Sequence, residues 1–281
     1  MATAFVLAGG GSLGAIEVGM LAALTEADVR PDFMVGTSVG AANAAWFALH
    51  PSDVDSLVSL WVSLRRTDVF PLRPVQGLLG LLGFRDHLVP QSSLRRLLER
   101  SLGSIDLTGT VIPVHVGATD VLSGAEVLLS KGNAVDSVLA STAIPAVFPP
   151  LLLDGRYLMD GGAVNNNPVS HAVELGADRV WVLPTGYACA LTSPPRSAIG
   201  VALQALTLLV NHRLALDVER YRDHVDLRVV PTLCPLRVSP GDFGRAQELI
   251  DAAFVSTRDW LAAGCLPGPV HPACGTTRPD S

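Results

Sequence analysis

The pentapeptide GTSVG, residues 36–40, carries the residue types that covalent catalysis needs. Ser38 lies between Gly36 and Gly40, after a short apolar run and before an alanine-rich stretch with a helical pattern. At a strand–turn–helix junction such a turn lifts the serine Oγ out of the backbone, and the helix N-terminus stabilises nearby negative charge. The pattern predicts a nucleophile. The alternative is a Gly/Ser turn that only packs a helix onto a sheet.

An activated serine needs a proton acceptor, and the segment MDGG, residues 159–162, offers one. Asp160 ends an apolar strand pattern, and Gly161 and Gly162 permit close approach of another backbone. A free aspartate has a pKa of about 3.9 and is a weak base at neutral pH. Burial beside an apolar pocket would raise that pKa. Taken by itself, this segment is more typical of an Asp-Gly turn that ends a strand, and a Ser–Asp dyad is the chemically reasonable alternative.

Histidines provide the other class of base. In an α/β-hydrolase, Asp160 would act with His171, His212 or His224. That fold places several strands before its nucleophile, whereas only one precedes it here. His171 and His212 also lie inside helical patterns. We therefore expect these histidines to have structural roles and Asp160 to be the base.

The stretch AGGGSLG, residues 8–14, is a third candidate. Gly9, Gly11 and Gly14 match the dinucleotide-binding pattern G-x-G-x-x-G, and amides at a strand-to-helix turn bind anions. A nucleotide-binding oxidoreductase would also need an acidic residue after the second strand. Thr37 and Ser38 stand there instead, and Asp32 precedes that strand. The nucleotide hypothesis is therefore the weaker alternative.

These candidates must be positioned by alternating strands and helices. Residues 3–8 predict a strand, a helix follows from Ser12 as a possible N-cap, and residues 33–36 predict the next strand. This alternation predicts right-handed crossovers and a parallel sheet in an α/β fold. Further expected strands cover 111–119, 126–130, 179–184 and 225–231, with a hairpin over 151–159. Further expected helices cover 39–49, 52–65, 92–101, 134–141, 199–221 and 243–263, with Pro168 as the first residue of another.

Composition limits the class of protein. The chain has 281 residues, 49% of them hydrophobic and 16% charged, as expected of one large core-rich domain. The net charge of -6 argues against a nucleic-acid surface. The four cysteines form no C-x-x-C pair, which argues against zinc or redox use and for a reducing compartment. No uncharged apolar run reaches 18 residues, so we expect a cytoplasmic protein.

Taken together, these segments resemble the patatin-like phospholipases, lipid acyl hydrolases with a Ser–Asp dyad. The resemblance rests on AGGGSLG, GTSVG and DGG in this order, supported by ASTAIPAVFPP at residues 140–150 and NNP at residues 166–168. It covers about residues 4–185. It implies a three-layer α/β/α fold with a mostly parallel central sheet. We expect the hydrolase domain to span residues 1–266, followed by a poorly ordered tail at 267–281.

The resemblance also implies the roles of residues. Ser38 would attack an acyl ester, Asp160 would act as general base, and the backbone amides of Gly9, Gly10 and Gly11 would form the oxyanion hole. It implies no cofactor and no metal. The supporting motif glycines are Gly14, Gly36, Gly40, Gly161 and Gly162.

One departure from the family pattern concerns substrate choice. Leu13 stands where many family members carry Arg or Lys. Phospholipase A, lysophospholipase and simple esterase activities therefore all stay open, as do neutral lipids and thioesters. A catalytically silent member that keeps the fold is a further alternative.

The irregular segment 69–84, VFPLRPVQGLLGLLGF, is apolar and punctuated by glycines. We expect it to cap an acyl pocket or to make a peripheral membrane contact. The alternative is that it packs into the core beneath a loop.

Overall fold

The computed structural model describes residues 1–71, 84, 86–186, 198–234, 236 and 238–265. The predicted tail at 267–281 and most of the segment 69–84 lie outside this part of the chain. The described strands are β1 (Thr3–Leu7), β2 (Phe33–Thr37), β3 (Val114–Asp120), β4 (Glu126–Leu129), β5 (Leu151–Leu153), β6 (Arg156–Asp160), β7 (Arg179–Leu183) and β8 (Asp226–Val229). The described helices are α1 (Gly14–Glu26), α2 (Val39–Leu49), α3 (Val54–Ser63), α4 (Arg66–Val69), α6 (Ser92–Leu102), α7 (Ala134–Ser141), α8 (Val169–Glu174), α9 (Ala198–Tyr221) and α10 (Ala246–Ala262).

One sheet carries all of these strands. Its order is β5-β6-β3-β2-β1-β7-β8, and β4 pairs with β3 outside this path. The strands β3, β2, β1, β7 and β8 are parallel, whereas β4, β6 and β5 join by antiparallel pairing. The mostly parallel sheet expected from the alternation of elements is confirmed, and so is the turn of the β5–β6 hairpin at Asp154.

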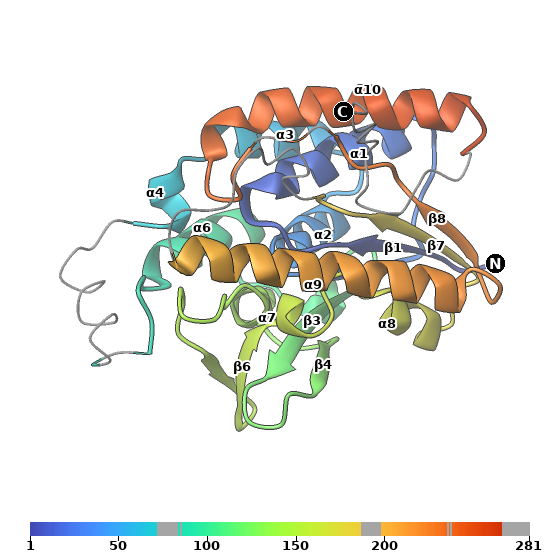
Figure 1. Cartoon of the computed structure of the whole chain (residues 1–281). Coiled ribbons are helices and arrows are strands. Elements are labelled where there is room, and N and C mark those ends of the chain that lie inside the picture. Colours follow the sequence, from blue (N-terminus) through green and yellow to red (C-terminus); the bar gives the residue numbers. More distant parts are fainter. Residues whose placement is uncertain (72–83, 85, 187–197, 235, 237, 266–281) are drawn as a thin grey trace, which may run out of the picture.

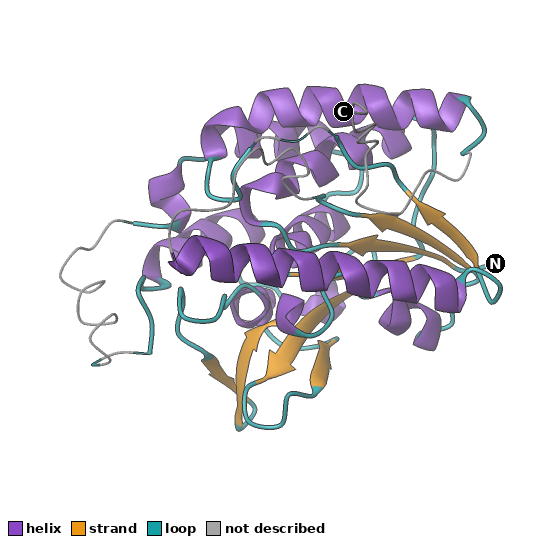
Figure 2. Ribbon diagram, viewed as in Figure 1, coloured by secondary structure: helices purple, strands orange, loops and turns teal. Residues whose placement is uncertain are grey.

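Helices cover both faces of this sheet. In β1, Phe5 and Leu7 face one apolar cluster, and Ala4 and Val6 face another. A strand whose successive side chains are all buried must be covered on both sides. Figure 1 shows α10 lying along one side with α1 and α3, and α9 running across the other; Figure 2 shows the same layers by element type. The three-layer α/β/α architecture is confirmed.

Two predicted details are wrong. Pro168 is the N-cap of α8 and not its first residue, which is Val169. Ser12 does not cap α1, because a 3-10 turn over Gly11–Leu13 precedes that helix and its N-cap is Leu13. The Ser12 hydroxyl donates instead to the Ser239 carbonyl, 3.1 Å away. A local cap is replaced here by a contact with a segment more than 200 residues further along the chain.

Strand register brings the candidate residues together. Leu7 of β1 pairs with Gly36 of β2, so the turn after β1 lies beside the end of β2. On the other side of β2, Thr37 pairs with Gly117 of β3, and Ala118 of β3 pairs with Asp160 of β6. The carboxyl ends of β1 and β2 and the end of β6 therefore meet at one edge of the sheet.

Candidate active site

Ser38 occupies the sharp turn between β2 and α2. Its backbone has φ 56 and ψ -126, an unusual conformation for a residue with a side chain. Such strain is found where the surrounding structure holds a functional group in place. The Ser38 amide donates to the Ser141 hydroxyl at 2.8 Å, and that hydroxyl donates to the Gly117 carbonyl. The turn is thereby tied to α7 and β3.

Asp160 is the hydrogen-bond partner of this serine. The Ser38 Oγ donates to Asp160 Oδ2 at 2.6 Å, and the two residues are 7% and 6% exposed. The other carboxylate oxygen accepts from the Gly162 amide at 2.7 Å. Burial raises the pKa of Asp160 to about 6, against the lowering effect of these two hydrogen bonds. An aspartate so placed is ionised at neutral pH and is a stronger base than a free one.

The glycine turn after β1 packs directly on Ser38. A Cβ built on Gly9 would lie 3.0 Å from the Ser38 Cβ and 2.3 Å from Asn166 Oδ1, so no side chain fits there. The Gly9 amide itself donates to the Asn166 carbonyl at 3.3 Å. Gly11 adopts φ +60, which favours glycine. With the Gly9 amide in a backbone bond, the amides of Gly10 and Gly11 are the better candidates for an oxyanion.

The supporting glycines lie at close contacts around the same edge of the sheet. At Gly40, an added Cβ would lie 2.5 Å from the Leu7 backbone. The backbone of α2 therefore contacts the end of β1 directly, with no side chain between them. At the four other motif glycines, an added Cβ would likewise lie less than 3.0 Å from a neighbouring atom: Gly14, Gly36, Gly161 and Gly162.

An apolar cavity of about 100 Å³ opens beside Ser38. Side chains of α2, α3 and α6 form its walls, and aromatic rings close it: Phe70 stacks on Phe148 at 5.4 Å and lies 6.2 Å from Phe243. Gly11 and Ser38 reach its surface, so the Ser38 side chain borders an apolar space. The part of segment 69–84 that the structure describes includes Val69 and Phe70, which line this cavity.

A buried polar chain connects this cavity to the glycine turn. The Trp61 indole N–H donates to Asn43 Oδ1, and the Asn43 amide donates to Glu17 Oε2, both at 2.8 Å. Glu17 Oε1 in turn accepts from the Ala8 amide at 2.6 Å, directly before Gly9. Glu17 is fully buried, which raises its pKa well above the usual value. Leu13, where a cation is common in the family that the sequence resembles, lies in the apolar core.

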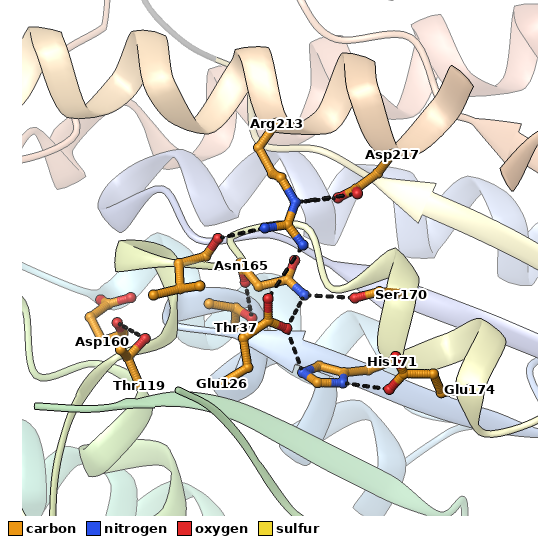
Figure 3. Close-up of polar contacts among 11 residues, drawn as sticks. Thr37, Thr119, Glu126, Asp160, Asn165, Ser170, His171, Glu174, Arg213 and Asp217 are labelled. Carbon is orange, nitrogen blue, oxygen red and sulfur yellow. Dashed lines mark hydrogen bonds and ion pairs between the residues drawn. The ribbon is translucent and has the colours of Figure 1, made fainter. Parts of the chain in front are cut away.

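A second polar cluster fastens the loop after Asp160 from the side of α9 (Figure 3). Arg213 donates to the Val164 carbonyl at 3.4 Å and to Glu126 at 3.3 Å. The Asn165 side-chain amide donates to Glu126 at 2.8 Å. The backbone carbonyl of Asn165 accepts from the hydroxyl of Thr37, next to Ser38. This cluster holds the loop from Asp160 to Asn166 against β2.

Of the histidines considered in the sequence, His212 and His224 are exposed, and His171 is engaged by two carboxylates. His171 contacts Glu126 at 3.1 Å and Glu174 at 3.5 Å (Figure 3). Its hydrogen bond to Glu126 raises the pKa of His171 and lowers that of Glu126 to about 2. The charge on His171 is thus used in an ion pair, which supports the structural role that we expected.

The nucleotide alternative finds no support in the position of Asp32. Its carboxylate accepts from the Thr3 amide at 2.6 Å, at the amino end of β1 and opposite the glycine turn. An acidic group there cannot reach a ribose held by the glycines.

Several residues of this site carry no motif in the sequence. Ser141 and Asn166 fall in stretches that support the resemblance, but neither stretch indicates their partners. Thr185 donates to the Gly9 carbonyl at 2.8 Å, and Phe243 lines the cavity. Both lie far along the chain from the turn that they contact, so only strand register and helix packing could reveal them.

Within the part of the chain that the structure describes, no three His, Cys, Asp or Glu side chains gather in a way that could hold a metal ion. Its helices include none with the length and apolar character needed to cross a membrane.

The sequence matches curated proteins over about two thirds of its length. Patatin-like phospholipase domain-containing protein 7 of Mus musculus is 31% identical over 66% of this chain. Lysophospholipase NTE1 of Pyricularia oryzae is 26% identical over 73% of this chain. The matched regions are 14% and 13% of those proteins, so the chain spans a small part of their length.

The fold has a solved relative. The crystal structure of VipD from Legionella pneumophila matches 93% of this chain and 67% of that chain, with a TM-score of 0.51 and 15% identity. The family model for patatin-like phospholipases matches residues 5–173, which include the glycine turn, Ser38 and Asp160. The chain belongs to the patatin-like phospholipase family.

Proposed function

We propose that this protein is a serine hydrolase that cleaves acyl esters of lipids through a Ser38–Asp160 dyad. The observation that carries this proposal is the 2.6 Å hydrogen bond from Ser38 Oγ to Asp160 Oδ2 beside an apolar cavity. Family membership and the names of the relatives, a lysophospholipase among them, support lipid esters as the substrate class.

The reaction proceeds through an acyl-enzyme. Ser38 Oγ attacks the ester carbonyl carbon while its proton passes to Asp160. The carbonyl oxygen becomes an oxyanion, which accepts hydrogen bonds from the amides of Gly10 and Gly11. Collapse of this intermediate breaks the ester bond, and the leaving alkoxide takes the proton from Asp160. Water then attacks the acyl group, Asp160 takes its proton, and that proton returns to Ser38 as the acid leaves.

The lining of the cavity indicates which part of a substrate it would bind. Its lining is aliphatic and aromatic apart from Gly11 and a few uncharged polar side chains, so it suits the acyl chain of an ester. Leu13 puts no cation beside the glycine turn, so this position does not select a phospholipid, and phospholipase A, lysophospholipase and simple esterase reactions are all compatible with the site. Location in the cytoplasm and contact with a membrane surface stay predictions.

The test is labelling with a fluorophosphonate probe together with hydrolysis of a p-nitrophenyl acyl ester. The Ser38→Ala variant is expected to lose the label and at least about 1,000-fold in kcat, because the nucleophile is gone. Ser63→Ala, which removes an exposed serine of α3, is the control and should behave as wild type. Equal labelling of wild type and Ser38→Ala would rule out the proposed mechanism.

A further inference from the structure

The glycine turn is held by a residue beyond the region that the family model matches. Thr185 follows the end of β7, and Leu183 of β7 pairs with Leu7 of β1, so Thr185 and Gly9 lie level with each other. The Thr185 hydroxyl donates to the Gly9 carbonyl at 2.8 Å and is buried. A Cβ on Gly10 would lie 2.3 Å from that hydroxyl, so Thr185 packs directly against the turn.

Asn166 holds the same carbonyl from the loop after Asp160. Its side-chain amide donates to the Gly9 carbonyl at 3.2 Å, and its own carbonyl accepts from the Gly9 amide. The Gly9 carbonyl therefore has two side-chain donors, both from segments more than 150 residues away. Two donors on one carbonyl fix the orientation of its peptide plane.

That orientation decides where the next amide points. In a trans peptide the C=O of one residue and the N–H of the next point in opposite directions. β1 lies between β7 and β2, so a Gly9 carbonyl directed to Thr185 turns the Gly10 N–H toward the end of β2. Ser38 stands at that end. Rotation of this peptide by half a turn would present a carbonyl oxygen to the oxyanion and repel it.

We propose that Thr185 is a positioning residue, which with Asn166 locks the Gly9–Gly10 peptide so that the Gly10 amide serves the oxyanion. This inference rests on the proposed function. Thr185 touches neither the nucleophile nor the base in the structure, and it acts through the peptide that it holds. Its contribution is therefore confined to the step in which charge develops on the carbonyl oxygen.

The Thr185→Val variant tests this, because valine keeps the shape and removes the hydroxyl donor. On a p-nitrophenyl ester, kcat is expected to fall about 10- to 100-fold with KM little changed. This fall approaches the one that follows removal of one hydrogen-bond donor from an oxyanion hole. Thr185→Ser keeps the donor and should return to within about threefold of wild type. The matched control is Thr110→Val, since the Thr110 hydroxyl also donates to a backbone carbonyl at 2.8 Å, that of Leu107.

A trifluoromethyl ketone separates positioning from a general loss of structure. Such a ketone forms a tetrahedral adduct with the serine, so its Ki is expected to rise by the factor by which kcat/KM falls. An unchanged Ki, or an equal loss in Thr185→Ser, would overturn the inference. If Thr185→Val does not fold, Thr185→Cys offers a weaker donor of similar size, and an intermediate loss in both readouts is expected.

The two proposals fail in different ways. If wild type shows hydrolysis that depends on Ser38 and Thr185→Val equals it in kcat and Ki, only the positioning role is wrong. If Ser38→Ala keeps the label and the activity of wild type, the proposed function itself is wrong.

Discussion

At the scale of single residues, the ionisation of Asp160 links activity to stability. Burial raises the pKa of its carboxyl to about 6, because little water reaches the charge. The protonated form is therefore favoured by folding, and the ionised form, which the proposed mechanism needs, is disfavoured. A group with a raised folded-state pKa stabilises the protein below its unfolded pKa and loses that stabilisation as pH rises through its folded pKa.

The pH dependence of activity and stability should follow from this shift. We expect kcat/KM to rise through about pH 6 as Asp160 ionises. The contribution of Asp160 to the free energy of unfolding, taken as the difference between wild type and Asp160→Asn, should fall by about 3 kcal/mol between about pH 4 and pH 6, since the pKa shift from 3.8 to about 6 costs about 1.4 kcal/mol per unit. Stopped assays and urea unfolding over this range measure both.

The Asp160→Asn variant isolates the carboxyl. It should lose about 100- to 10,000-fold in kcat, as expected for a general base, and be more stable than wild type above pH 6. Asp154→Asn, at an exposed residue of the β5–β6 turn, is the control and should change neither quantity. An Asp160→Asn protein with full activity would contradict the assignment of the base.

At the scale of elements, we expect helices α3 and α6 to limit the length of acyl chain that the site accepts, because both line the cavity. Leu60 of α3 and Leu97 of α6 line the cavity and are only half-buried, so they bound it without belonging to the most tightly packed core. The amphipathic pattern of each helix predicts a buried face. It does not predict that these faces leave a space between them, because that depends on the relative placement of the two helices.

Filling this space should shorten the preferred chain. For Leu97→Trp we expect kcat/KM on p-nitrophenyl laurate to fall about tenfold relative to kcat/KM on the butyrate. This factor corresponds to the free energy of burying about two methylene groups of the acyl chain. Leu261→Trp, at a half-buried leucine of α10 outside the cavity, is the matched control. An unchanged laurate-to-butyrate ratio in Leu97→Trp would show that the acyl chain lies elsewhere.

At the scale of the whole molecule, the segment after residue 173 completes the fold that the family model matches. Helix α10 lies along α1 (Figure 1), and a Cβ on Gly19 of α1 would meet the Ile250 carbonyl at 2.3 Å and the Ala253 Cβ at 2.9 Å. Two helices approach this closely only where one of them lacks a side chain. Phe243, just before α10, then reaches the cavity.

A methyl group at this contact should separate the two helices. Gly19→Ala is expected to lower the free energy of unfolding by about 1–3 kcal/mol, although alanine favours the helix itself by about 1 kcal/mol. Urea denaturation measures this change. Gly241→Ala adds a methyl with nothing within 4 Å and should stay within about 0.5 kcal/mol of wild type. Equal stability of the two variants would contradict the close docking of α10.

The sequence alone determined the order of the elements and predicted Ser38 and Asp160 as the candidate pair. Apolar runs predict the strands, glycines beside Ser38 and Asp160 indicate turns, and the order of these motifs resembles a family with a Ser–Asp dyad. The extents of most elements followed for the same reason. The capping role given to Ser12 failed because its hydroxyl found a partner in Ser239, which no local pattern indicates.

Only the tertiary structure decided what surrounds that pair. Asp160 meets Ser38 because β6 pairs antiparallel with β3 while β3 pairs parallel with β2. Thr185 meets Gly9 because β7 pairs with β1, more than 170 residues away in the chain. Such partners are set by strand register and by the sides of the sheet that the helices cover. Their residue types are common, so nothing in their local sequence distinguishes them until the sheet is assembled.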